Sequence, residues 1–208
     1  MIKKIITTVM LLYGAANAQS INLGYNALQA GITDQKDARI RAYTNISLST
    51  QGIRVGYHGL NEAGRNYLFG RETFKIGIDK EPLDLIYTTR IAGTQLSNVK
   101  QVDEAVGIRL SIPQNTIMDY GFIDIVKHQE GQKKFETVAF AGKNISGVTL
   151  ETTLALSGNG SKYLEMELIG PKIINVGDFN IKPYGRLEMP NIELNEKSTI
   201  IVGIHGML

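Results

Sequence analysis

Apolar residues recur at every second position along almost the whole chain, and this period of two limits what the chain can fold into. In residues 40–48, Ile40, Thr44 and Leu48 are among the members of one parity, and polar or charged residues occupy the other. Successive side chains of a β-strand point to opposite faces, so such a segment forms a strand with one apolar and one polar face. Beyond the first eighteen residues we find no 3.6-residue period of a long amphipathic helix. The sequence therefore predicts an all-β protein.

The alternating segments are about ten residues long, and short polar or glycine-bearing breaks separate them. Counted in order they predict about twelve strands, with eight or ten as alternatives, near residues 20–32, 38–49, 52–60, 66–78, 83–96, 100–112, 116–127, 134–142, 145–157, 161–175, 178–194 and 199–208. A two-residue loop at Thr50 and Gln51 would pair Leu48 with Ile53. Residues 117–127 and 135–142 have no clear phase, and we expect bulges there. An even count with short connections predicts a closed antiparallel up-and-down barrel, with the last strand paired to the first.

The first eighteen residues have the pattern of a secretory signal peptide. Lys3 and Lys4 precede an apolar run of about ten residues, and Ala16-Asn17-Ala18 has the small-x-small pattern of a cleavage site. The run is well short of the ~20 residues that a membrane-spanning helix needs. We therefore predict a signal peptide at 1–18 and one β-barrel domain at 19–208.

Charge and composition exclude several kinds of partner. The chain has 22 Lys and Arg and 20 Asp and Glu, and removing Lys3 and Lys4 with the leader leaves 20 basic against 20 acidic residues. A nucleic-acid partner would require a basic patch or stripe, so we expect no nucleic acid. With no cysteine and three histidines, the chain has little to offer a metal site, and we expect neither a metal nor another cofactor.

Alternation alone does not say whether the apolar face meets a protein core or lipid. A soluble barrel turns its apolar residues inward, whereas an outer-membrane barrel turns them outward and fills its lumen with polar and small residues. A tilted strand needs about 9–11 residues to cross the hydrocarbon of a membrane, and the alternating segments have about this length, which favours the membrane. So do glycine and alanine at the polar positions and connections short enough for closure. A soluble exported β-barrel that binds an apolar ligand stays as an alternative.

The last ten residues, "TIIVGIHGML", alternate up to the C-terminal residue. Together with the leader and the strand pattern, they resemble bacterial outer-membrane β-barrel proteins. In that family the last strand carries a signal for the barrel-assembly machinery, usually with a terminal phenylalanine. Here the corresponding residues are Ile200, Val202, Ile204 and Leu208, with Gly206 interrupting the series. The resemblance implies a place in the outer membrane of a Gram-negative cell, with outer-membrane lipid and, during biogenesis, that machinery as partners; homo-oligomerisation stays open.

If the apolar parity faces outward, charged residues of both signs line the lumen. The predicted lumen-lining residues are Arg39, Arg41, Arg54, His58, Lys75, Arg90, Arg109, Glu151, Glu165, Glu167, Lys182, Arg186 and His205. These charges either pair across a filled lumen or line a hydrated one, depending on barrel width. Because twelve strands leave room for small solutes, our first expectation is a narrow porin-like channel for passive diffusion of small polar or charged solutes. A closed structural or surface-binding barrel is the alternative.

We expect no enzymatic activity. Barrel hydrolases use Ser/His or Asp/His groups, so each histidine needs a partner. Neither His58 nor His128, which lies in the polar segment "KHQEGQK", has a serine or aspartate at a recognisable spacing. The pairing of the last strand places His205 in the lumen, where it lines the wall.

Overall fold

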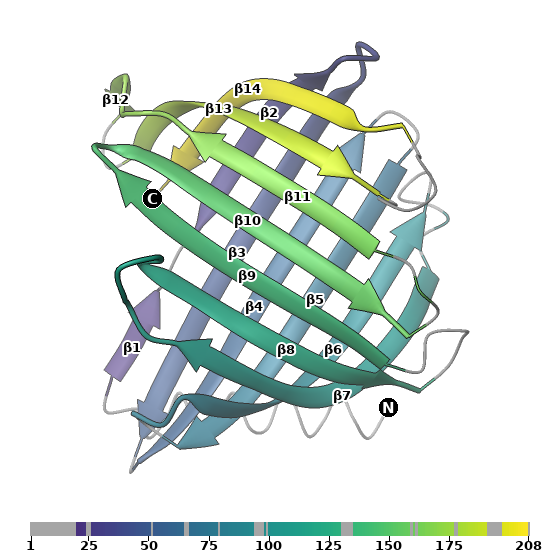
Figure 1. The fold of residues 1–208 in the computed structure, drawn as a ribbon, viewed down its shortest axis with the longest axis vertical. Coiled ribbons are helices and arrows are strands. Elements are labelled where there is room, and N and C mark those ends of the chain that lie inside the picture. The colour runs from purple at the N-terminus through teal and green to yellow at the C-terminus, as the bar shows by residue number, and fades with distance from the viewer. Residues whose placement is uncertain are drawn as a thin grey trace.

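The computed structural model is a closed, all-β antiparallel barrel whose wall has twelve strand positions, which we call staves (Figure 1). The structure describes residues 20–23, 26–50, 52–64, 67–78, 80–93, 98, 100–129, 135–158, 160, 162–176, 179–190 and 197–207. The predicted signal peptide at 1–18 and the predicted terminal signal residue Leu208 lie outside these residues. In the described part of the chain, we find no helix long and apolar enough to span a membrane.

The strands follow one another around the barrel wall in chain order (Figure 1). They are β1 (Ser20–Leu23), β2 (Ala27–Thr33), β3 (Ala38–Thr50), β4 (Ile53–Gly64), β5 (Tyr67–Ile78), β6 (Leu83–Gly93), β7 (Lys100–Ile112), β8 (Tyr120–His128), β9 (Phe135–Ile145), β10 (Val148–Ser157), β11 (Lys162–Ile169), β12 (Ile174–Val176), β13 (Phe179–Met189) and β14 (Thr199–Met207). Both β1 and β2 pair with β3, and both β11 and β12 pair with β13. Each of these couples is one interrupted stave, so the predicted count of twelve is confirmed.

The last strand closes the barrel by pairing with β13 on one side and β2 on the other. Along this seam Gly203 lies opposite Gly31. A Cβ on Gly203 would overlap the carbonyl oxygen of Ala30, so this close approach of two backbones requires glycine. The expected pairing of the first and last strands is confirmed, and it removes both free edges of the sheet.

Two details of the predicted register are wrong. Thr50 pairs with Ile53 and Leu48 with Val55, so the register differs from the predicted one, and Gly52, before Ile53, has a φ of 82°. The shift is two residues, which leaves the apolar face of the hairpin unchanged. The pairings of β8 and β9 run without a break, and the irregularity lies instead in the β6–β7 pair, between Arg90 and Ile91.

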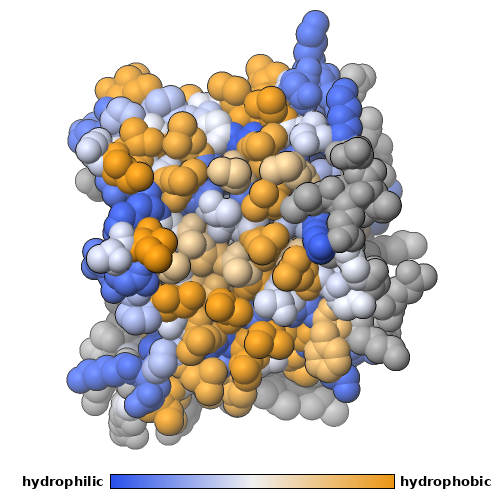
Figure 2. Space-filling model, viewed as in Figure 1, coloured by the Kyte–Doolittle hydropathy of each residue, from blue (hydrophilic) through white to orange (hydrophobic). Residues whose placement is uncertain are grey.

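The barrel is apolar outside and polar inside. Outward residues such as Ile32, Leu85 and Val202 are 61%, 62% and 63% exposed, and Figure 2 shows apolar side chains over most of one face of the wall. Inward residues include Gln29 and Asp124, both 0% exposed. A water-soluble barrel has the opposite arrangement, so this wall is suited to lipid.

The C-terminal strand follows the same rule. Ile200, Val202 and Ile204 are all exposed on the outer face of β14. An apolar outer face on the closing strand is compatible with contact to lipid. Their role as an assembly signal stays a prediction.

The outward apolar face predicts a position-dependent cost of charge. Ile125, in β8, is 46% exposed, and Ile117, in the connection between β7 and β8, is 78% exposed. We expect Ile125→Arg to destabilise the barrel in lipid by about 2–4 kcal/mol, because its guanidinium would lie in hydrocarbon. The control Ile117→Arg should change the stability by less than about 0.5 kcal/mol. Urea unfolding in lipid vesicles measures both values, and equal effects would contradict a lipid-facing wall.

Candidate functional site in the barrel lumen

The inner face of the barrel contains a dense group of charged side chains centred on two arginines. We call it the Arg41–Arg186 cluster; its carboxylates are Glu62, Glu165, Glu167 and Glu188. The residues come from β3, β4, β11 and β13, and all belong to the parity that faces inward. The cluster therefore joins strands from separate parts of the wall.

Arg41 connects β3 to three other strands. Its Nε lies 2.5 Å from a carboxylate oxygen of Glu62 on the neighbouring β4. Its terminal nitrogens lie 2.7 Å from Glu165 on β11 and 3.2 Å from Glu188 on β13. Around the wall, β2, β14 and β13 separate β3 from β11, so these bonds cross the lumen as a chord. Charge-assisted bonds of this kind are the stronger ones in proteins.

Arg186 crosses the lumen in the other direction. From β13 its Nη2 lies 2.8 Å from Glu62 on β4, and its Nε lies 3.0 Å from Glu188. The Arg186 side chain is fully buried. Nearby, Gln29 donates a hydrogen bond of 2.7 Å to Glu167 and lies 3.3 Å from His205. The lumen at this level is filled by side chains.

The opposite wall contains a second set of pairs. Arg109 on β7 donates two bonds to Asp124 on β8, of 2.6 and 2.8 Å, and its guanidinium lies 3.9 Å from the centre of the Phe122 ring. Arg54 on β4 pairs with Asp84 on β6 at 2.7 Å. The bidentate and stacked geometry of Arg109 is specific to arginine.

A histidine with two carboxylates lies at the end of the barrel away from the C-terminal end of β14. His128, the last residue of β8, contacts Asp103 through Nδ1 and lies 3.4 Å from Glu136 through Nε2. Glu136 also forms an ion pair with Arg90. The prediction that His128 lies in a polar loop, with no serine or aspartate at a recognisable spacing, is wrong, because β8 extends to His128 and turns it inward, where it contacts Asp103.

All thirteen residues predicted to line the lumen lie on the inward parity of their strands. The ion pairs bring together Arg39, Arg41, Glu165, Glu167 and Arg186, whereas Arg54, Arg90 and Arg109 each pair elsewhere. Glu151 accepts a hydrogen bond of 2.5 Å from Tyr120. His58 lies on β4 and Lys75 on the neighbouring β5. Lys182 lies opposite His205 in the register of β13 and β14. Their role in lining a channel stays a prediction.

Sequence reasoning missed several of the partner residues. Glu62 lies opposite Arg41 in the β3–β4 hairpin, and extending the predicted hairpin with its correct turn would have found this pair. Asp124 and Glu136 lie in the two segments whose phase was unclear in the sequence. Gln29, which contacts Glu167 and His205, is uncharged, and no pattern in the sequence indicates that it takes part in these contacts.

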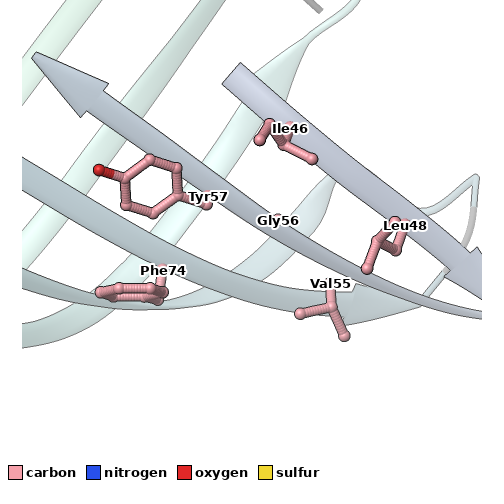
Figure 3. Close-up of a pocket in the computed structure, with 6 residues that line it drawn as sticks. All are labelled: Ile46, Leu48, Val55, Gly56, Tyr57 and Phe74. Atoms are coloured by element: carbon pink, nitrogen blue, oxygen red, sulfur yellow. The ribbon is translucent and has the colours of Figure 1, made fainter. Parts of the chain in front are cut away.

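A groove on the outer wall is separate from this charged interior. It has a volume of about 340 Å³ and lies over β3, β4 and β5. Figure 3 shows Tyr57 and Phe74 at one end and Leu48 and Val55 at the other. The side chains around it are apolar apart from the Tyr57 hydroxyl, so it offers contact to hydrocarbon and little chemistry.

Removing one arginine of the Arg41–Arg186 cluster should be costly. Arg186→Gln would leave the buried carboxylate of Glu62 with a weaker partner, and we expect a loss of about 3–5 kcal/mol in the free energy of unfolding. The control is Lys143→Gln, since Lys143 pairs with Asp119 at a partly exposed site, 3.0 Å away. That change should cost no more than about 1 kcal/mol. Urea titrations of the folded barrels measure the free energy of unfolding of both variants. Equal losses in Arg186→Gln and Lys143→Gln would show that the cluster stabilises the barrel no more than a partly exposed ion pair does.

Comparisons with known proteins agree on the fold. No protein-family model matches the sequence, and no curated protein sequence matches it. Among solved structures, outer membrane phospholipase A from Escherichia coli is similar, with a TM-score of 0.57 and 9% identity over 87% of this chain and 89% of that one. The Salmonella typhi outer membrane phospholipase dimer with bound calcium gives a TM-score of 0.62 and 9% identity over 91% and 93%.

These neighbours correct one expectation. The sequence analysis predicted that the chain is not an enzyme, and the neighbours show that an enzyme uses this barrel architecture. The fold therefore gives no ground for excluding catalysis, and the histidine at the mouth has the acidic partner that the sequence analysis did not find. At 9% identity the likeness concerns the fold. With its twelve antiparallel staves and outward apolar wall, the chain has the fold of bacterial outer-membrane β-barrels.

Proposed function

We propose that this protein is an outer-membrane barrel whose lumen is sealed by buried ion pairs and hydrogen bonds. The observation that carries the proposal is the Arg41–Arg186 cluster, which spans the lumen in two directions. A diffusion channel needs a continuous path of water, whereas the inward residues Gln29, Asp124 and His205 are not exposed at all. This packing favours the closed barrel over the porin-like channel that was our first expectation.

The size of the lumen does not conflict with a sealed state. Twelve strands enclose more space than a barrel of eight, but the inward residues here are long. Arginine and glutamate side chains reach from β3 and β4 to β11 and β13, and their charges pair in the middle. Opening a path would separate several of these pairs at once, and each separation leaves a charge buried without a partner.

If the lumen is sealed, the protein acts through its outer wall and the two ends of the barrel. The wall contacts lipid and the two ends face aqueous compartments, so a partner that meets the folded barrel binds on the wall or at a rim. The proposal thus corresponds to the closed structural or surface-binding barrel that the sequence leaves open.

A hydrolase acting at one rim is the second candidate. His128 with Asp103 is the kind of pair in which a carboxylate orients an imidazole for proton transfer. The solved neighbours are phospholipases by name, which makes phospholipid the substrate class to test. Glu136 argues against this candidate, because it lies 3.4 Å from Nε2, the nitrogen that would have to exchange a proton with a nucleophile.

The sealed state predicts the electrical behaviour of the barrel. In planar bilayers the native protein should give no steady open-channel conductance, and Arg41→Ala combined with Arg186→Ala should introduce discrete steps, since both chords across the lumen are then lost. Heat-dependent mobility in SDS gels shows whether the double variant folds. If it does not, Glu165→Gln with Glu188→Gln weakens the same chords. Steady conductance of the native barrel would contradict the proposal.

The hydrolase candidate has its own test. Phospholipid hydrolysis by the purified native barrel, lost in His128→Ala and retained in His205→Ala, would support an active site at the mouth. The matched control is suitable because both histidines are buried, inward and on different strands. No release of fatty acid from phospholipid vesicles would reject phospholipid hydrolysis at this rim.

A further inference from the structure

Two cations on β5, inside the barrel, have no close carboxylate partner among the residues that the structure describes. Their neighbours are already paired, as Arg54 with Asp84, Arg109 with Asp124 and Arg90 with Glu136. Of the carboxylates in the described part of the chain, Asp124 forms the ion pair with Arg71, at 3.6 Å from its Nη2. Its Nε and Nη2 are buried and have no hydrogen-bond partner. For Lys75, the described residues provide no ion pair.

Hydroxyl groups and a histidine lie between these two cations. Arg71, Thr73 and Lys75 follow one another on the inward face of β5. Thr73 is opposite His58 on β4 and opposite Thr88 on β6, and the two threonine hydroxyls are 3.2 Å apart. Both threonines are buried. The excess positive charge therefore adjoins a buried polar surface with hydroxyl donors.

The glycine opposite Lys75 shows where that side chain lies. Gly56 on β4 pairs with Lys75, and a Cβ at Gly56 would overlap the Lys75 methylene chain. Glycine thus leaves room for the lysine to lie across the inner surface of β4. From there its charge acts on His58, as do the charges of Arg71 and Arg109.

We propose that Arg71, Lys75, Thr73 and Thr88 form a binding site for a small oxyanion inside the barrel. The Nε–H and Nη2–H groups of arginine form the edge of the guanidinium that donates two parallel hydrogen bonds to oxygens of a carboxylate or phosphate, and in Arg71 neither of these nitrogens has a hydrogen-bond partner. Lys75 adds a second positive charge. The site goes beyond the sealed-lumen proposal and does not depend on it, since an anion can enter while the barrel folds.

Such a ligand would stabilise the folded barrel. A buried guanidinium without a partner is unfavourable, and an anion placed against it offsets that cost. An anion that binds the folded chain alone shifts the unfolding equilibrium by mass action, whether or not the folded lumen is accessible. Stability at equilibrium therefore reports the site even if the lumen is sealed.

The test is urea unfolding and refolding in detergent micelles at constant ionic strength, with chloride replaced stepwise by phosphate or by acetate. Above the dissociation constant, each tenfold rise in the concentration of free oxyanion should lower the unfolding equilibrium constant by up to tenfold. A rise in the urea midpoint with either oxyanion supports the site, and the larger rise identifies which oxyanion it prefers.

Variants separate the site from general salt effects. Phosphate also stabilises folded proteins by exclusion from their surface, and that effect is shared by all variants. Arg71→Leu with Lys75→Met should lose the oxyanion-specific rise, while the control Lys143→Gln should keep it. If the double variant does not fold, Arg71→Lys replaces it, because lysine cannot offer the two-pronged edge. Equal rises in native and variant barrels, or none beyond chloride, would overturn the proposal.

Discussion

Buried charge is the constraint on which the rest of this structure depends. The outer face of the wall is largely apolar, so the polar parity of the strands turns inward, where an unpaired charge is costly. The Arg41–Arg186 cluster meets this demand by letting two guanidinium groups share four carboxylates. Because its partners lie on strands from separate parts of the wall, the cluster fixes the walls relative to each other. Its charge balance and the barrel geometry are therefore coupled.

The two faces of the sheet divide the roles. The outer face is mainly apolar, with side chains such as Ile32, Leu85 and Val202. The inner face depends on particular partners, as in the bidentate bond of Arg109 to Asp124 and the bond of Gln29 to Glu167. Where pairing is incomplete, at Arg71, an external anion is the simplest completion. Where a histidine meets two acids, at His128, the wall comes nearest to a catalytic arrangement.

Strand number, closure and the direction of each face follow from alternation, because a membrane wall forces one parity to be apolar along its whole length. The pairing register of the β3–β4 hairpin was misplaced by two residues, since a shift of two preserves that parity and leaves no trace in the sequence. The contact of Arg41 with Glu165 was out of reach, because it joins strands that are not neighbours and depends on how long side chains meet in a closed space. The expectation of no enzymatic activity was wrong as a general argument, since it relied on spacing along the chain while His128 finds Asp103 on the adjacent strand.

Water access to the lumen tests the sealed barrel most directly. The chain has no cysteine, so a single one can be introduced at Val126, which is inward on β8 and 1% exposed, and at Ser198, which is exposed. A charged, membrane-impermeant thiol reagent should modify Ser198→Cys quickly in the folded barrel. It should leave Val126→Cys unmodified until the barrel is unfolded. Modification of both at similar rates in the folded state would mean that water fills the lumen, and the sealed barrel would be wrong.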